Sequence, residues 1–583
     1  MKRYICLAAM AAGVLFGATS CDGLFSDAPI DKLSGVNIWG DRLLLDEYEN
    51  SWYRNMSNGF SIYMPTNGLV KSLGRDYPAW YTDQMTVSKT TWSSTSYGDI
   101  LKSSDEEIYK RAYQYWNACY GQLRSINTLL DHAGEITTPT RDRVLGEAHF
   151  MRAYYYYLLL RRYGGVLLVD REYNTLNDPA RFPRASYDEM VDFIVADADE
   201  AARLLPRQHE SADAGRATKG AALMLKAKTY LWAASPMFQE RDTAWLGFKG
   251  DRSREMLAKA KAAYDEVTAL GLYSLVPLEG STQDEIKDSY RKIFLTKNSA
   301  ESIFEVQHNN DGNYAAGWGH KLDRDAAAPF FGGTDCAYVP TQNHVDEYGM
   351  RQGQPDPARP YDNRDYRFYA NVLYDGCTYR GHVMDIHYRV EGGREVPGAD
   401  LKPYGTSETA AVTVTGYYMG KFVNPATEIN NDPTYASSQN YIIWRYAELL
   451  LDYAEIELRL GNAAAALQKV NQVRQRAKMP PLAALTWDAY ANERRVEMAF
   501  EETVYWDMYR WGTAMDKMNG GTTPLMGVKI VEQEGKPTRY TYGRVNRYPK
   551  RVRVFRPRQF YWPLPWDEVR YQHIEQNPEW VEL

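Results

Sequence analysis

The chain has 583 residues, enough for several domains or for one large array of helical repeats. Hydrophobic residues make up 44% of it and charged residues 25%, which is typical of a folded protein rather than a disordered one. The formal net charge of −7 argues against nucleic acid or anionic lipid headgroups as the main partner. The 46 tyrosines and 15 tryptophans supply rigid amphipathic area, which suits packing and recognition surfaces alike.

The N-terminal stretch MKRYICLAAMAAGVLFGATSCDGLF has the features of a secretory signal. Lys2 and Arg3 open it, an uncharged apolar stretch follows, and small residues precede Cys21. That order resembles a bacterial lipobox, although Ala18 stands where Leu is usual. The resemblance implies a signal peptide over residues 1–20, cleavage before Cys21 and acylation of that residue, for example with palmitate. A plain signal peptide with an incidental Cys21 is the alternative.

The mature chain would then be tethered to a membrane without crossing it, because no other segment reaches the roughly 18–20 apolar residues of a span. The remaining cysteines are Cys119, Cys336 and Cys377, and none has the CxxC or other spacing of a metal site. Three thiols allow at most one disulfide, and we expect buried free thiols instead.

The stretch MRAYYYYLLLRRYGGVLL, residues 151–168, is interrupted by arginines and is too short to span a bilayer. Apolar residues recur there and just upstream at steps of three and four, as on one face of a helix; they are Val144, Ala148, Met151, Tyr155 and Leu158. Gly164 ends the predicted helix. The tyrosines are therefore predicted to pack against neighbouring helices, and a functional aromatic surface is the alternative.

Similar helical patterns flank this stretch. One covers residues 106–134, and another begins at a capping box of Ser186 and Glu189 and ends at Pro206. A third begins at a Thr218 cap, and SREMLAKAKAAYDEVTALGLYSL follows it.

Near the C-terminus, YAELLLDYAEIELRLGNAAAALQKVNQVRQRAKMPP predicts two helices joined at Gly461-Asn462, the second ending at Pro480. This arrangement resembles the tetratricopeptide hairpin, which must stack on neighbours to bury its apolar face. We expect a helical scaffold mainly over residues 105–275 and 440–515.

Two stretches differ in composition from these helices. Residues 52–104 and 300–435 are rich in Gly, Asn, Asp, Thr, Tyr and Trp and are predicted to form loops and short strands. Loops of that length in a compact protein are usually functional or disordered, and the aromatic content argues against disorder.

Several motifs together resemble the SusD/RagB family of Bacteroidota outer-membrane nutrient-binding lipoproteins, over nearly the whole chain. They are GEAHFMRAYYYYLLLRRYGGVLL, RATKGAALMLKAKTYLWAASPMF, IIWRYAELLLDYAEIELRLGN, VNQVRQRAKMP, NERRVEMAFEETVYWDMYRWG and FYWPLPWDEVRYQHIEQNPEW. The chain departs from the family pattern at His149, Leu168, Glu502 and Val504, where Arg, Pro, Gly and Arg are usual.

The resemblance implies a mainly α, SusD-like fold forming a single domain over residues 21–583. Tetratricopeptide-like hairpins would be the scaffold, and long irregular loops with a few short strands would form the ligand-binding face. It also implies a lipoprotein on the outer face of the outer membrane, seated on a SusC-like TonB-dependent transporter. Such a protein captures an oligosaccharide or polysaccharide and releases it to the channel, without catalysis.

Catalytic motifs are missing from the sequence: HExxH, GxSxG and GxxxxGK[ST] do not occur. NNDGNYAAGWG hints at a calcium loop but lacks the spaced acids and the terminal Glu. A carboxylate pair for glycoside hydrolysis is compatible with the composition, whereas the helical-hairpin scaffold argues against it. We therefore expect no cofactor and no metal.

Binding a sugar requires a flat aromatic ring against its C–H face and polar groups for its hydroxyls. Three loop stretches offer both, and their candidate glycan-binding residues are Arg75, Asp76, Trp80, Tyr81, Asp83, Trp92, Asn309, Tyr314, Trp318 and Tyr338. Trp80 and Trp318 are the strongest candidates because their surroundings are non-helical and rich in Gly or Pro. The alternative for each ring is that it plugs the core beneath its loop. The tryptophans in predicted helices are expected to be buried: Trp116, Trp232, Trp506 and Trp511.

The sequence leaves two other functions open. One is a peptide-binding or glycopeptide-binding member of the same uptake system, because peptide sites rely more on backbone hydrogen bonds and charge. The other is a glycan-degrading enzyme. The identity of a glycan depends on loop shape, which one sequence does not define.

Overall fold

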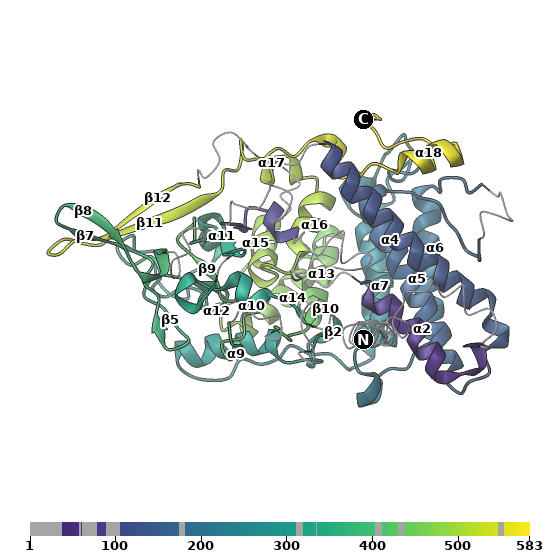
Figure 1. Ribbon diagram of the computed structural model, residues 1–583, viewed down its shortest axis with the longest axis horizontal. Coiled ribbons are helices and arrows are strands. Elements are labelled where there is room, and N and C mark those ends of the chain that lie inside the picture. Colours follow the sequence, from purple (N-terminus) through teal and green to yellow (C-terminus); the bar gives the residue numbers. More distant parts are fainter. Residues whose placement is uncertain are drawn as a thin grey trace, which may run out of the picture.

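Long helices, each packed against the next in the chain, form one end of the molecule (Figure 1). The computed structural model describes residues 38–56, 60, 78–88, 105–173, 181–309, 319–333, 335–402, 411–429, 436–545 and 553–582. The helices of this end are α2 (Arg42–Arg54), α4 (Asp105–Asp131), α5 (Arg141–Tyr163), α6 (Tyr187–Leu204), α7 (Lys219–Ala233) and α8 (Ser253–Ala269). From α8 the array continues to α13 (Tyr446–Arg459), which packs against α14 (Ala463–Arg476) and α15 (Trp487–Glu497).

The ends of these helices follow local sequence signals. Ser186 and Glu189 form the predicted capping box at the start of α6, and the Thr218 side chain accepts from the Ala221 N–H at the start of α7. Helix α5 ends at Gly164, whose φ of 73° favours glycine. Helix α14 ends at Arg476, before the predicted Pro480, and Lys478 beyond it has a left-handed backbone with φ of 55°.

The tyrosines of α5 are core residues, as predicted. Tyr154, Tyr155, Tyr156 and Tyr157 are at most 4% exposed. The Tyr155 hydroxyl donates to the Trp52 carbonyl at 2.7 Å, so its buried polar end is satisfied. The helical tryptophans Trp116, Trp232 and Trp506 are also buried, whereas Trp511, just after its helix, is half-buried.

Short helices and strands make up the rest of the described chain. The helices are α9 (Gln283–Leu295), α10 (Leu322–Ala326), α11 (Gln342–Glu347), α12 (Tyr366–Asn371), α16 (Thr503–Arg510), α17 (Ala514–Lys517) and α18 (Trp566–Gln572). The strands are β1 (Met85–Thr86), β2 (Ser302–Val306), β3 (Val339–Pro340), β4 (Val372–Leu373), β5 (Thr378–Tyr379), β6 (His382–Val383), β7 (Tyr388–Glu391), β8 (Arg394–Pro397), β9 (Tyr418–Met419), β10 (Tyr441–Arg445), β11 (Met526–Glu532) and β12 (Arg539–Arg544). The mainly α fold with few short strands agrees with the prediction.

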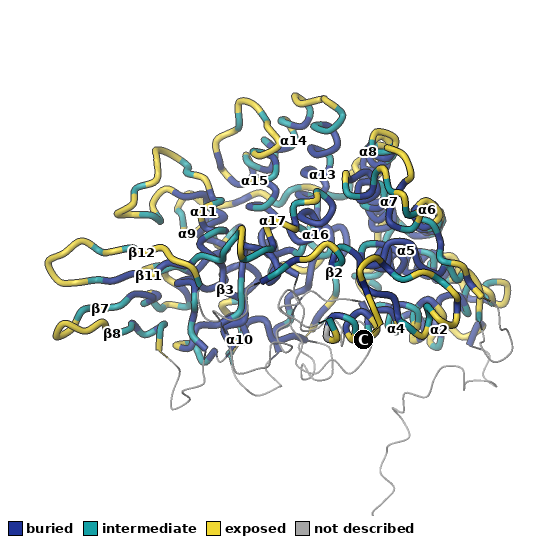
Figure 2. The backbone as a smooth tube through the Cα atoms, turned by 90° about the horizontal axis from the view of Figure 1, so that it is seen from above, coloured by how far each residue is buried: buried dark blue, intermediate teal, exposed yellow. Residues whose placement is uncertain are grey.

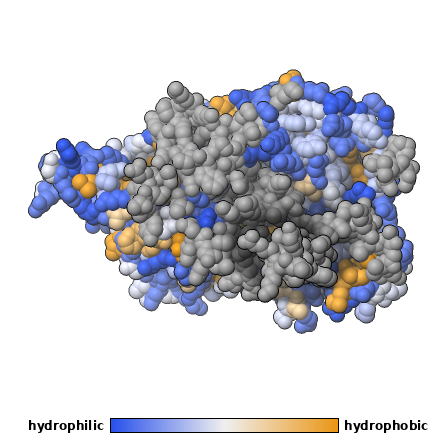
Figure 3. Space-filling model, viewed as in Figure 1, coloured by the Kyte–Doolittle hydropathy of each residue, from blue (hydrophilic) through white to orange (hydrophobic). Residues whose placement is uncertain are grey.

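A four-stranded sheet projects from the end opposite the helical array (Figure 1). Its order is β12-β11-β7-β8, with β11 and β7 parallel and the outer pairs antiparallel. The turns at its tip are exposed, β11 is largely buried, and β12 is exposed along most of its length (Figure 2). Hydrophilic residues predominate at this tip in Figure 3.

Within the described residues, no helix combines the length and the apolar composition that crossing a bilayer requires. Cys119 and Cys336 are buried, Cys377 is half-buried, and all three are free thiols, as expected. Burial raises the pKa of Cys377 to about 11, so this thiol is protonated at neutral pH.

Candidate functional site

Three of the predicted platform rings lie in the core, which corrects the expectation that they form an open aromatic surface. Trp80 is 3% exposed, Tyr81 4% and Tyr338 0%. The Trp80 ring packs on Tyr338 with centroids 5.4 Å apart, and Tyr81 packs on Tyr505 at 5.6 Å. A ring enclosed in this way has no free face for a sugar, so the core-packing alternative applies to these residues.

Two features hold this segment in the interior. The Arg553 guanidinium donates to the carbonyls of Trp80 and Thr82, each at 2.9 Å. Asp83 is also buried, and its carboxylate pairs with Arg495 at 2.6 Å. The charge of Asp83 is thus used inside the protein rather than offered to a ligand.

Of the other candidates, Asn309 is exposed at the end of the segment that follows β2. Five candidates lie outside the described residues: Arg75, Asp76, Trp92, Tyr314 and Trp318. Residues 1–20 and Cys21 also lie outside them. The site prediction therefore stands as a proposal at Asn309 and at these five positions.

The described residues contain a surface hollow of about 410 Å³ whose walls carry several tyrosines, named here the tyrosine groove. Its aromatic members are Tyr361, Tyr369, Tyr374 and Tyr540. Its remaining lining residues are Gln283, Arg351, Ala358, Arg359, Pro360, Asp362, Asn363, Asp375 and Gly376. The groove lies near the base of the projecting sheet, between the start of α9, the segment before α12, the segment after β4, and β12.

Three rings of the groove are half-buried, so each keeps part of its surface accessible: Tyr361, Tyr374 and Tyr540. The centroids of Tyr361 and Tyr374 are 4.7 Å apart, and Tyr540 meets Tyr361 edge-on at 6.1 Å. Behind them, Phe368 stacks on Tyr374 at 5.1 Å and fixes its position. Burial raises the pKa of Tyr361 and of Tyr374, so both hydroxyls are neutral hydrogen-bonding groups.

Polar side chains border these rings. Arg351 is held by its own bonds: Nη1 donates to the Tyr366 hydroxyl at 2.7 Å and Nε to the Arg364 carbonyl at 2.8 Å. Arg359 and Asp362 are exposed and pair at 3.5 Å. Fixed rings with polar groups at their edges are the combination that a sugar requires.

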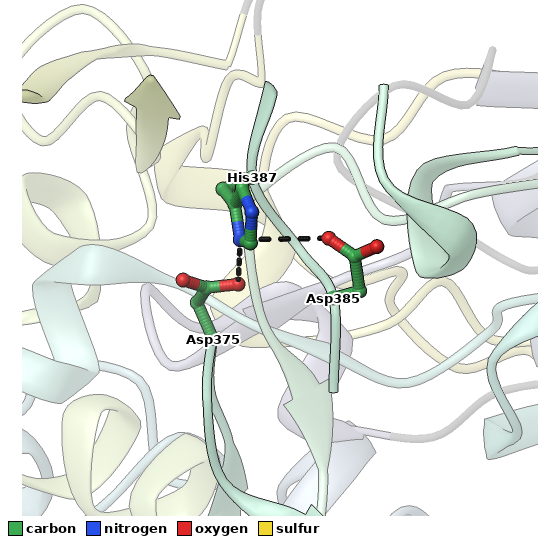
Figure 4. A group of neighbouring side chains, drawn as sticks. All are labelled: Asp375, Asp385 and His387. Atoms are coloured by element: carbon green, nitrogen blue, oxygen red, sulfur yellow. Dashed lines mark hydrogen bonds and ion pairs between the residues drawn. The ribbon is translucent and has the colours of Figure 1, made fainter. Parts of the chain in front are cut away.

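One wall of the groove continues into a cluster that could hold a cation: Asp375, Asp385 and His387 (Figure 4). Their ligand atoms lie within 4.8 Å of one another, and both carboxylates point toward the imidazole. His387 Nδ1 is 2.8 Å from Asp375 Oδ1 and 3.5 Å from Asp385 Oδ1.

The negative charges of this cluster are already balanced by hydrogen bonds and ion pairs within the protein. The hydrogen bond with Asp375 raises the pKa of His387, which favours a protonated ring that bridges the carboxylates. Arg389 donates to both oxygens of Asp385, at 3.0 and 3.1 Å. A metal ion would have to displace the His387 proton beside this guanidinium, so the contacts favour an ion-paired cluster.

Sequence reasoning did not select the tyrosine groove, although most of its residues fall within the loop-rich region 300–435. The stretch PARPYDNRDYRFYANVLYDG shows clustered tyrosines and turn residues and is the signal that could have identified it. Tyr540 gives no such signal, because it joins the groove only through the pairing of β12 with β11.

Comparisons with known proteins agree with the architecture. Residues 300–580 match the model of the SusD family, and residues 61–231 match a model described as starch-binding associating with outer membrane. A SusD-like protein of Bacteroides ovatus is 25% identical over 68% of this chain, and the match spans 65% of that relative's length. A SusD-like protein of Formosa agariphila is 24% identical over 72% of this chain and 76% of its own.

Solved structures show the same fold. A SusD-like protein from Bacteroides fragilis superposes with a TM-score of 0.71 at 26% identity, covering 95% of this chain and 100% of its own. Surface glycan-binding protein A from Bacteroides thetaiotaomicron gives a TM-score of 0.62 at 17% identity, over 93% of this chain and 100% of its own. With family models that match residues 61–231 and 300–580 and this shared architecture, the chain belongs to the SusD/RagB family.

Proposed function

We propose that this protein is a non-catalytic, cell-surface glycan-binding lipoprotein that captures an oligosaccharide or polysaccharide for a TonB-dependent outer-membrane transporter. The family supports carbohydrate binding, since its structural neighbours include a SusD-like carbohydrate-binding protein of Bacteroides fragilis. The observation that carries the proposal within this chain is the tyrosine groove: half-buried rings from three separate segments, bordered by arginine, aspartate and asparagine side chains.

The groove residues have the ring positions and the polar rim that suit a sugar-binding site. Tyr374 and Tyr361 are fixed by neighbouring rings, so little side-chain entropy is lost when a pyranose packs on them. Asn363 and Asp362 are exposed at the rim and offer acceptors and a donor to hydroxyl groups. Asn309 and the five candidates outside the described residues remain separate proposals as glycan-binding residues.

Isothermal titration of the full chain against a panel of polysaccharides tests the proposal, with oligopeptides as the comparison. Tyr540→Ala should weaken binding of the recognised glycan at least several-fold, because it removes one ring of the groove. Tyr542→Ala is the matched control: it lies two residues along the same strand, is 46% exposed and does not line the groove. Equal affinity in wild type and Tyr540→Ala would mean that the groove is not the glycan-binding site. Binding of peptides but not of glycans would mean that the ligand is a peptide.

The anchor and the transporter are tested separately. Cys21→Ala should abolish metabolic labelling with a palmitate analogue and release the protein from the membrane fraction. Labelling that persists in the variant would contradict acylation at Cys21. Affinity purification of the native protein from membranes should recover a TonB-dependent transporter, and its consistent absence would contradict the partnership.

A further inference from the structure

A second cavity lies deep in the scaffold, where the C-terminal part of α5 meets α7 and the start of α16. Its volume is about 80 Å³, enough for several water molecules or one small ion. Two consecutive cationic residues of α5, Arg161 and Arg162, line it, together with Tyr115 and Trp506. Glu502, the residue just before α16, completes the polar wall.

The two arginines have no carboxylate partner within the part of the chain that the structure describes. Arg162 is 6% exposed, and its Nε and Nη1 atoms lack a hydrogen-bond acceptor there; the same holds for Nε of Arg161. Their guanidinium groups instead lie over the ring of Trp506, at 4.3 and 4.7 Å from its centroid. A buried cation with unsatisfied donors is costly unless a counter-charge accompanies it.

The other charges around the cavity are already paired. Lys228 meets Glu448 at 2.6 Å, Arg510 meets Asp507 at 2.8 Å, and Glu501 meets Arg445 at 2.6 Å. That leaves Arg161, Arg162 and Glu502, two positive charges against one negative. One monovalent anion would balance them.

The backbone at Glu502 also indicates a specialised position. Its φ is 64°, in the left-handed region that costs a non-glycine residue conformational energy. Burial raises the pKa of Glu502 to about 7, outweighing the opposite effect of Arg162 and Arg161. Near neutral pH a fraction of the chains therefore carries an uncharged Glu502, which increases the positive charge in excess.

We propose that this cavity binds one small monovalent anion, a halide or a short carboxylate, through the Arg161 and Arg162 guanidinium groups. The anion accepts hydrogen bonds from the unsatisfied nitrogen atoms of the two arginines. The site is separate from the tyrosine groove, so it does not depend on the identity of the glycan.

Crystals of the full chain soaked in sodium bromide provide the direct test. An anomalous peak within hydrogen-bonding reach of Arg162 is expected, and an empty cavity or one holding only water would overturn the proposal. A formate or acetate soak distinguishes a carboxylate from a halide, and density for either anion supports the site.

Thermal unfolding in solution gives an independent readout. Sodium chloride should raise the Tm above its value in sodium gluconate of equal ionic strength, since gluconate is too large for the cavity. At roughly ten times the dissociation constant, the increase for a chain of this size is about 1 °C. No difference between the two salts, with formate and acetate equally inactive, would contradict the proposal.

Variants assign the effect to the cavity. Arg162→Gln should abolish the chloride-specific increase in Tm. If that variant does not fold, Arg161→Gln should do the same. Arg203→Gln, at an exposed ion pair of α6, is the control and should retain it. Glu502→Gly removes the competing carboxylate and the left-handed strain, so chloride should bind it more tightly; weaker binding would mean that the arginines are not the anion's partners.

Discussion

Arg445 and Glu497 form an ion pair, 2.8 Å from Nη1 to Oε1, in which neither side chain has any exposure to solvent. The pair joins β10 to α15 and belongs to a larger network. Arg445 also bonds Glu301 at 2.7 Å and Glu501 at 2.6 Å. Glu497 in turn accepts from Arg367 at 2.9 Å, so the network links the C-terminal helices to α12.

Arg445→Gln should therefore be strongly destabilising. It removes the cation shared by three buried carboxylates, whose other partners are Arg367, Arg476 and Lys421, and so leaves the network one positive charge short, which costs about 3–5 kcal/mol in comparable sites. Chemical denaturation of both proteins measures the change in the free energy of unfolding. Arg203→Gln serves as the surface control and should leave it unchanged, and a similarly small effect of Arg445→Gln would show that the network contributes little to stability.

A second buried pair predicts how stability responds to acid. Burial by itself would raise the pKa of Glu455, but Arg510, with Arg459 and Arg494, holds it at about 2 against 4.5 in the unfolded chain. Because the folded value is the lower one, this carboxylate stabilises the fold fully above pH 4.5, and the contribution is lost as the pH falls toward 2.

Glu455→Gln should accordingly be less stable than wild type at pH 7. The difference in unfolding free energy between the two proteins should shrink steadily between pH 4.5 and 2. Denaturant unfolding across that range is the measurement. A difference in unfolding free energy that stays constant down to pH 2 would mean that the pKa of Glu455 is not lowered in the folded state.

Replacing either of two glycines near the helical array with alanine should change the stability of the protein in opposite directions. A Cβ on Gly165 would lie 2.0 Å from the Ala185 carbonyl oxygen, so Gly165→Ala must displace backbone and should cost about 1–3 kcal/mol or more. Gly121 lies in α4, is exposed and has nothing within 4 Å of such an atom. Gly121→Ala should stabilise the helix by about 0.5–1 kcal/mol. Melting temperatures of the two variants test the contrast, and a destabilised Gly121→Ala would contradict it.

The helical scaffold could be predicted from sequence because its signals are local. The Ser186–Glu189 capping box, the Thr218 cap and the Gly164 terminus each depend on residues within one or two turns of helix. The repeat of apolar residues around Tyr155 likewise identified residues that are buried in α5, although the helix is buried on its other sides as well.

The side toward which a loop residue points is not a local property. Trp80 lies in a stretch that the composition predicted to be loop and short strand, and the structure places it in a short 3-10 helix, Pro78–Tyr81. Its burial depends on Arg553 and Tyr338, which lie far along the chain. The tyrosine groove shows the same limit, since Tyr361 and Tyr540 meet only in the folded protein.

The charges of the tyrosine groove predict which sugars it prefers. Arg351 and Arg359 balance Asp362 and Asp375, so the groove has no net charge to attract an anionic polysaccharide. Binding of a neutral glycan should then change less than about twofold between ~0.05 M and ~0.5 M salt, because little screening of charge is involved. Titrations in sodium gluconate vary the ionic strength without supplying an anion small enough for the Arg161–Arg162 cavity. Arg359→Ala should lower the affinity without creating salt dependence, whereas a wild-type affinity that falls tenfold at high salt would identify an acidic or sulfated ligand instead.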